Sequence, residues 1–213
     1  MQFDNWNFWI NALQGHPTHC KHGHINVFVK LIKEIFSDTG KILVVGCGEG
    51  LEVKVLKDIG FDPVGITLGE SNLRYAKETF SDYDIRIMEM HCLNFPPDFF
   101  DYVISIHNFE HSFAPMIHCL EVNNALKQNG LWFIAMPEYK YDILLEQGLS
   151  HHHPNLIPDE VYEQIFLTCG FQIIDKFLSR KDDYYRENSW LLKKTNKYIH
   201  SDVKSALEQR RNY

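Results

Sequence analysis

Residues 41–51 read K-I-L-V-V-G-C-G-E-G-L and organise the rest of the chain. The apolar, partly β-branched run at 42–45 is typical of a fully buried parallel strand. Gly46, Gly48 and Gly50 follow at alternate positions, and the apolar residues after them recur at helical spacing. A buried strand, a glycine turn and a helix together predict the first unit of a nucleotide-binding α/β sheet. Glycine allows close approach of a ligand to the backbone, and the helix N-terminus offers free N–H groups to an anionic group.

The spacing of the glycines argues against a dinucleotide fingerprint. That pattern, G-x-G-x-x-G, would need glycine at position 51, where Leu51 stands. The loop is G-x-G-x-G, and it resembles the first motif of the class I S-adenosylmethionine (SAM) dependent methyltransferases. An E-H pair at 110–111, L-K-Q-N-G at 126–130 and C-G-F at 169–171 resemble later segments of the same family, in the same order. An NAD(P)-binding oxidoreductase remains the less favoured alternative.

The resemblance covers residues 25–195 and implies an α/β fold. We expect a doubly wound, seven-stranded, mostly parallel sheet with helices on both faces and one antiparallel strand near the C-terminus. The periodicity places the elements as follows. Helices are expected at 25–36, 51–59, 70–80, 115–128 and 161–169, and strands at 42–45, 61–68, 85–89, 102–106, 131–136, 171–178 and 189–194.

Composition narrows the class of protein. The chain has 213 residues, of which 45% are apolar and 23% charged, as expected of one globular domain. The net charge of −7 argues against a nucleic-acid binder, and no apolar run approaches the ~20 residues of a membrane span. The N-terminus lacks a signal-peptide pattern. Five cysteines without a C-x-x-C pair favour reduced thiols, so we predict a cytoplasmic protein.

The two ends of the chain are predicted to lie outside the central domain. In residues 1–24, aromatic and aliphatic residues recur at helical spacing and are followed by His19, His22 and His24. This segment is either a lid over a substrate or an N-terminal helical extension packed on the sheet edge. Residues 196–213 are predicted to form a helical tail, which is either solvated or a site for an acidic partner.

The resemblance implies where the cofactor binds. It assigns the amino-acid end of SAM to Gly46, Cys47, Gly48 and Gly50, and the ribose to Thr67 and Leu68. The adenine would meet Glu89, Met90 and His91, with His107 at the edge of the cofactor. Val44 and Thr67 stand where the family usually has acids. These two departures are the main support for the alternative of a catalytically silent SAM-fold binding module.

Histidines after the fourth strand are the candidates for chemistry. Ligands bind beyond the carboxyl ends of parallel strands, which is where His107, Glu110 and His111 are expected. A histidine in this cluster, or His152 in the later H-H-H run, suits the role of a base that removes a hydroxyl proton. The cluster also resembles one in ubiquinone-biosynthesis O-methyltransferases. A divalent metal on these side chains is a less favoured alternative, and a purely structural brace is another.

The sequence therefore predicts a SAM-dependent methyltransferase. The favoured acceptor is a small polar molecule, methylated on a hydroxyl, and neither a nucleic acid nor a membrane is expected as partner. The identity of the acceptor and the oligomeric state are not encoded in any pattern found.

Overall fold

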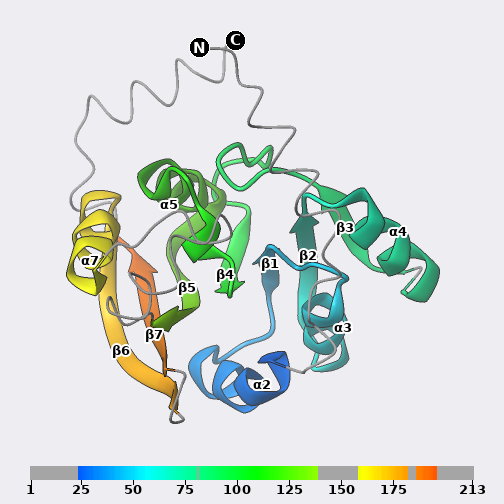
Figure 1. The fold of residues 1–213 in the computed structure, drawn as a ribbon, viewed down its shortest axis with the longest axis horizontal. Coiled ribbons are helices and arrows are strands. Elements are labelled where there is room, and N and C mark those ends of the chain that lie inside the picture. Colours follow the sequence, from blue (N-terminus) through cyan, green and yellow to red (C-terminus); the bar gives the residue numbers. More distant parts are fainter. Residues whose placement is uncertain (1–23, 81, 139–157, 182–185, 196–213) are drawn as a thin grey trace, which may run out of the picture.

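The computed structural model describes residues 24–80, 82–138, 158–181 and 186–195. Within these ranges the chain alternates helices and strands around one sheet (Figure 1). The helices are α2 (His24–Ile35), α3 (Leu51–Asp58), α4 (Glu70–Thr79), η2 (Phe109–His111, a 3-10 turn), α5 (Pro115–Ala125) and α7 (Asp159–Thr168). The strands are β1 (Lys41–Val45), β2 (Asp62–Thr67), β3 (Asp84–Ile87), β4 (Phe100–Ile106), β5 (Leu126–Glu138), β6 (Phe171–Lys181) and β7 (Arg186–Lys194).

The seven strands form one sheet in the order β3-β2-β1-β4-β5-β7-β6. The pairs β1–β2, β1–β4, β2–β3 and β4–β5 are parallel, whereas β7 runs antiparallel to both of its neighbours, β5 and β6. This confirms the predicted sheet with its antiparallel strand near the C-terminus. Val45 pairs with Ile66 on one side and Ser105 on the other, so β1, β2 and β4 end side by side.

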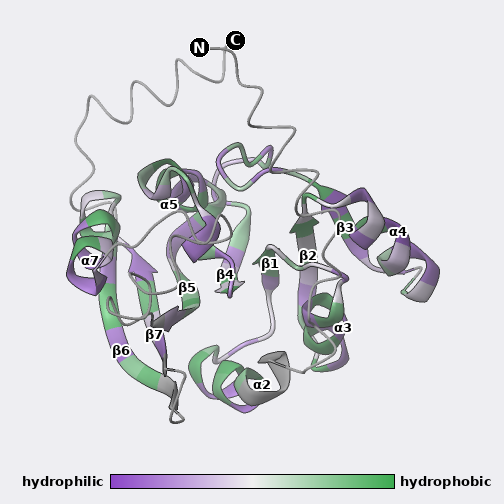
Figure 2. Ribbon diagram, viewed as in Figure 1, coloured by the Kyte–Doolittle hydropathy of each residue, from purple (hydrophilic) through white to green (hydrophobic). Residues whose placement is uncertain are grey.

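Each face of the sheet is covered by its own group of helices. Residues of β1 alternate, so that Leu43 and Val45 pack into the core under α5 and α7, while Ile42 and Val44 pack against α2, α3 and α4. The helices show hydrophilic and hydrophobic residues side by side in Figure 2, as expected of helices that bury one face. The fold is therefore doubly wound, as the sequence predicted.

The segment between α5 and β5 differs from the prediction. The helix expected at 115–128 ends at Ala125, because Leu126 already pairs with Phe100 of β4. The register then moves to Tyr102 opposite Leu131, so residues 127–130 bulge from the ladder where a simple turn was expected. The last strand also begins at Arg186, three residues earlier than predicted.

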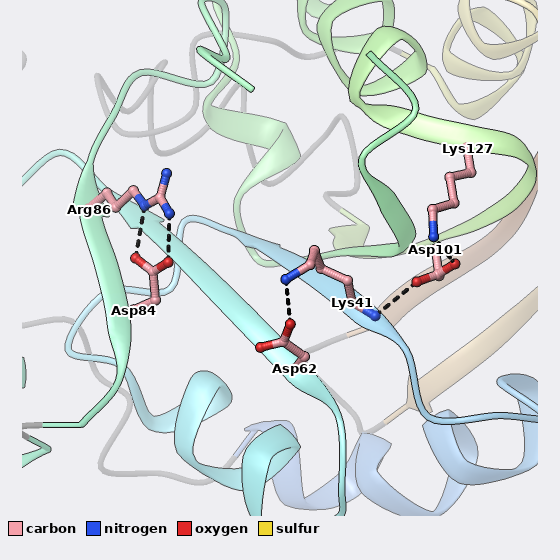
Figure 3. A network of polar contacts seen from close by, with 6 residues as sticks. All are labelled: Lys41, Asp62, Asp84, Arg86, Asp101 and Lys127. Carbon is pink, nitrogen blue, oxygen red and sulfur yellow. Dashed lines mark hydrogen bonds and ion pairs between the residues drawn. The ribbon is translucent and has the colours of Figure 1, made fainter. Parts of the chain in front are cut away.

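Charged side chains join neighbouring strands at the amino ends of the sheet (Figure 3). Lys41 Nζ pairs with Asp62, and the main-chain N–H of Lys41 donates to Asp101 Oδ2 at 2.9 Å. Within β3, Arg86 donates two hydrogen bonds to Asp84, at 2.8 and 2.6 Å, and lowers the pKa of that carboxyl. Exposed ion pairs of this kind are each worth about 0–1 kcal/mol. The ion pairs lie at the edge of the sheet opposite to the carboxyl ends of β1, β2 and β4.

Several predictions fall outside the described residues. The predicted lid at residues 1–24, apart from the start of α2, and the predicted tail at 196–213 lie there, as does His152. The domain boundaries therefore stay predictions. No helix in the part of the chain that the structure describes is long and apolar enough to cross a membrane.

Candidate active site

A pocket of about 150 Å³ opens at the carboxyl ends of β1, β2 and β4. Its walls come from the loops that follow these strands and from Met88 and Met90 after β3. This is the edge at which ligands bind in open parallel sheets. Of the residues predicted to bind the cofactor or act in catalysis, those that line the pocket are Gly46, Gly48, Thr67, Leu68, Met90, His107 and His111.

The glycine loop needs glycine for two separate reasons. Gly46, Gly48 and Gly50 have φ of 71°, 51° and 92°, in the left-handed region that other residues rarely adopt. A Cβ on Gly46 would also lie only 2.1 Å from Asn108 Nδ2. Gly50 is the N-cap of α3, and its N–H donates to the Cys47 carbonyl at 2.8 Å. Cys47 and Gly50 do not line the pocket, and the hydrogen bond between them closes the turn of the loop.

An uncharged pair of side chains, Thr67 and Asn72, lies at the end of β2. Asn72 Nδ2 lies 3.4 Å from Thr67 Oγ1, and both side chains are buried and line the pocket. Glu70, in the first turn of α4, is exposed and does not line the pocket. The acid that the family resemblance expects here is therefore replaced by a hydroxyl and an amide, and Asn72 is a pocket residue that the sequence analysis missed.

His107 directly follows β4 and has a φ of 50°. Positive φ is uncommon outside glycine and is found preferentially at functional sites. His107 Nε2 is in contact with Oε2 of Glu187, a β7 residue that is only 1% exposed. A buried carboxylate in this position orients the imidazole and fixes which nitrogen carries the proton. Glu187 had no local signal in the sequence, because it is 80 residues from His107.

Glu110 lies beneath the pocket wall and does not line it. Its Oε1 is 4.0 Å from His111 Nε2, and its Oε2 has no hydrogen-bond partner among the described residues. Burial raises the pKa of Glu110, against the opposing attraction of His111 and His107. The predicted cluster of His107, Glu110 and His111 is thus brought together, with the two imidazoles in the wall and the carboxyl behind them.

Two further carboxyl groups belong to this region: Glu52 is buried and Glu89 is half-buried. Burial raises the pKa of Glu52, in the first turn of α3, to about 7. The charge of His107 opposes this by lowering the pKa of Glu52. Glu89 binds His91, which is 3% exposed, and neither residue lines the pocket. Among the described residues no group of three or more histidine, cysteine or acidic side chains is arranged to hold a metal ion.

The comparisons with known proteins agree with this architecture. Residues 43–134 match a family model described as a methyltransferase domain. The ubiquinone biosynthesis O-methyltransferase of Roseobacter denitrificans is 24% identical over 188 aligned residues, which cover 78% of this chain and 74% of the relative.

Two solved structures show how widely the fold is shared. An S-adenosylmethionine-dependent methyltransferase from Clostridium acetobutylicum superposes with a TM-score of 0.70 at 12% identity, over 90% of this chain and all of that one. The cyclase SpnF superposes with a TM-score of 0.66 at 13% identity, over 79% of this chain and 80% of that one. The matched segment, the glycine loop and the sheet order together give the chain the fold and the first motif of the class I, Rossmann-like S-adenosylmethionine-dependent methyltransferases, which it resembles.

Proposed function

We propose that this methyltransferase methylates a hydroxyl oxygen of a small polar acceptor, with His107 as the base. The observation that carries the proposal is the contact between His107, in the pocket wall, and the buried carboxylate of Glu187. An imidazole oriented by a carboxylate is a common arrangement for removing a proton from a hydroxyl group.

The chemical groups that line the pocket suit the different parts of SAM. Backbone N–H groups of the glycine loop suit its carboxylate, and the Thr67–Asn72 pair offers a hydroxyl and an amide to the ribose. The thioethers of Met88 and Met90 present an apolar, polarizable surface of the kind that aromatic rings pack against, which suits the adenine. Asn108 Oδ1 is buried without a hydrogen-bond partner among the described residues, so the wall keeps unused acceptor capacity.

His107 handles the proton in this proposal. The Nε2–H of the neutral ring donates to Glu187, so Nδ1 carries the lone pair. As the acceptor oxygen forms its bond to the methyl carbon, its O–H bond breaks and the proton passes to Nδ1, while the bond between that carbon and sulfur would break and S-adenosylhomocysteine would leave. Glu187 then faces an imidazolium ion and stabilises its charge. SAM, when bound, supplies the electrophilic methyl group, so the main task left to the protein is positioning, which can lower a barrier by roughly 7–11 kcal/mol.

Two further observations support a small acceptor. The relative from Roseobacter denitrificans is named an O-methyltransferase of ubiquinone biosynthesis, and a comparable hydroxyl is the acceptor proposed here. The net charge of −7 disfavours a polyanionic substrate.

The test measures S-adenosylhomocysteine release with a panel of phenols, sugar hydroxyls and carboxylates. The wild-type chain is compared with His107→Asn, because asparagine tolerates the positive φ that alanine would strain. We expect turnover with a hydroxyl acceptor and a loss of about 10²–10⁴-fold in kcat in the variant, the range of general-base contributions. His111→Ala and His152→Ala are expected to lose less. Full activity in His107→Asn would contradict the assignment of the base.

A silent SAM-binding module is the competing proposal, because Val44 and Thr67 stand where the family usually has acids. Labelled SAM incubated with a cell extract separates the two. Label transferred to a small molecule supports the enzyme, whereas tight binding with no transfer to any fraction supports the module.

A further inference from the structure

A hydrogen-bonded chain of three side chains lies beside the pocket without lining it. His91 Nε2 is 2.7 Å from Ser112 Oγ, and His91 Nδ1 is in contact with Glu89 Oε1. Glu89 Oε2 also accepts the main-chain N–H of His91 at 2.7 Å. The order hydroxyl, imidazole, carboxylate links the segment after β3 to the segment after β4. Below we call Glu89, His91 and Ser112 the relay.

The hydrogen bonds assign the tautomer of His91. The main-chain N–H of Ala114 donates to His91 Nε2 at 3.3 Å, and a backbone N–H can only donate. Nε2 must therefore carry the lone pair, and the proton resides on Nδ1, where it is donated to Glu89. The hydroxyl of Ser112 then donates to the same lone pair, at the shorter distance of 2.7 Å. Every polar atom of the imidazole is used, so its orientation is set from three sides.

The burial of Ser112 and His91 excludes a direct catalytic role for the relay. Ser112 is 0% exposed and His91 is 3% exposed, so the hydroxyl cannot act as a nucleophile on an outside molecule. Both carboxylate oxygens of Glu89 are engaged by His91, which leaves this acid with a supporting task. A buried polar chain whose members are all satisfied makes the surrounding structure rigid.

The relay joins two walls of the pocket through sequence neighbours. Met90 lies between Glu89 and His91, and His111 directly precedes Ser112. Met90 and His111 both line the pocket, on segments that come from different strands. The hydrogen bond between Ser112 and His91 therefore fixes the distance between Met90 on one side of the pocket and His111 on the other.

We infer that Glu89, His91 and Ser112 are positioning residues that hold Met90 and His111 at the spacing needed for the adenosine part of the cofactor. The inference rests on the proposed function, because it takes SAM as the occupant of the pocket. Loss of the relay lets the two walls separate, so it weakens every ligand that contains adenosine, whether or not the amino-acid end is present.

The experiment compares Ser112→Ala with Ser105→Ala by calorimetric titration with S-adenosylhomocysteine and with 5′-methylthioadenosine. Ser105 is the matched control, since it is equally buried, accepts a hydrogen bond from Trp132 Nε1 at 3.1 Å and does not line the pocket. We expect both variants to lose similar thermal stability. Only Ser112→Ala should raise Kd, by about tenfold and to the same factor for both ligands, as expected when a binding wall is displaced.

A spectroscopic readout tests the relay itself. Nitrogen-15 labelled histidine spectra of the wild-type chain should show His91 protonated on Nδ1 and unprotonated on Nε2, and Glu89→Gln should alter that signal. An opposite tautomer, or an unchanged Kd in Ser112→Ala, overturns the inference. A wild-type chain that binds neither ligand overturns the proposed function and the relay's part in it, whereas the His91 signal reports on the relay independently of any ligand.

Discussion

His107 Nε2 and Glu187 Oε2 are in hydrogen-bonding contact across 80 residues of sequence. The contact exists because β7 is inserted antiparallel between β5 and β6, which brings the start of β7 to the carboxyl end of the parallel strands. His107 belongs to the pocket wall, and Glu187 lies behind it, shielded from solvent.

Glu187→Gln tests whether this contact serves catalysis. The amide keeps the size of the side chain but cannot stabilise an imidazolium ion, so we expect kcat to fall at least about tenfold while Kd for SAM stays within about twofold. Glu160→Gln makes the same chemical change at an exposed position of α7 and should change neither value. Equal losses in kcat and in binding would indicate a structural role instead.

Gly46→Ala should abolish SAM binding. The variant combines a positive φ with a Cβ placed 2.1 Å from Asn108 Nδ2, so the pocket wall must move. Gly60→Ala is the control, since its φ of 102° imposes a similar backbone strain of about 1–3 kcal/mol but its nearest contact is 3.2 Å, to Thr39. Calorimetric titration should find binding lost only in Gly46→Ala. Equal binding by both variants would show that the contact with Asn108 is unimportant.

Stability should fall as the pH rises through the titration of Glu52. Burial raises the pKa of this acid from an ordinary 4.5 to about 7, so the folded chain holds the proton more tightly than the unfolded chain. Ionising it between about pH 4.5 and 7 therefore costs the folded state free energy, on the order of 3 kcal/mol. The raised pKa of Glu110 acts in the same direction.

Glu52→Gln removes this titration, and urea unfolding at pH 5 and pH 8 measures the difference. We expect the variant to lose less stability than the wild-type chain on going from pH 5 to pH 8. Glu34→Gln, at an exposed position of α2, should follow the wild-type chain. A variant with the wild-type pH dependence would show that another group is responsible.

Lys194→Met should destabilise the bulge at the start of β5. Lys194 is 4% exposed, and its Nζ donates to the Leu126 carbonyl at 2.6 Å and to Asp98 at 2.8 Å. Methionine keeps the apolar stem but leaves the carbonyl without this charged donor, at a cost of about 1.5–3 kcal/mol. Chemical unfolding measures the loss. Lys193→Met, at the half-buried neighbouring position, should cost clearly less.

The sequence by itself determined the fold class and the position of the pocket. The apolar run at 42–45, the three glycines and the helix after them are local signals, because periodicity and turn chemistry depend on residues close together in the chain. They predict the first unit of a nucleotide-binding α/β sheet. The doubly wound, seven-stranded sheet followed from the resemblance of the later segments to the methyltransferase family, and the structure confirms it. Strands that alternate with helices also predict which ends of the strands meet, and hence that His107 and His111 would stand near the glycine loop.

Local signals did not predict the boundary between α5 and β5, where helix and strand compete for the same residues. The apolar spacing of α5 continues past Ala125, but the pairing of Leu126 with Phe100 draws the next residues into the sheet. A ladder hydrogen bond to a distant strand thus overrides helical periodicity at this boundary.

Only the tertiary structure decided which side chains support the candidate site. Glu187 reaches His107 from β7, Asn108 packs over Gly46, and Ser112 meets His91 across 21 residues. The position of Glu89 suggested an adenine ligand, yet its carboxylate is engaged by His91. Such contacts depend on strand order and on which face each side chain occupies after packing. No pattern of neighbouring residues encodes them, because the partners become neighbours only when the sheet has formed.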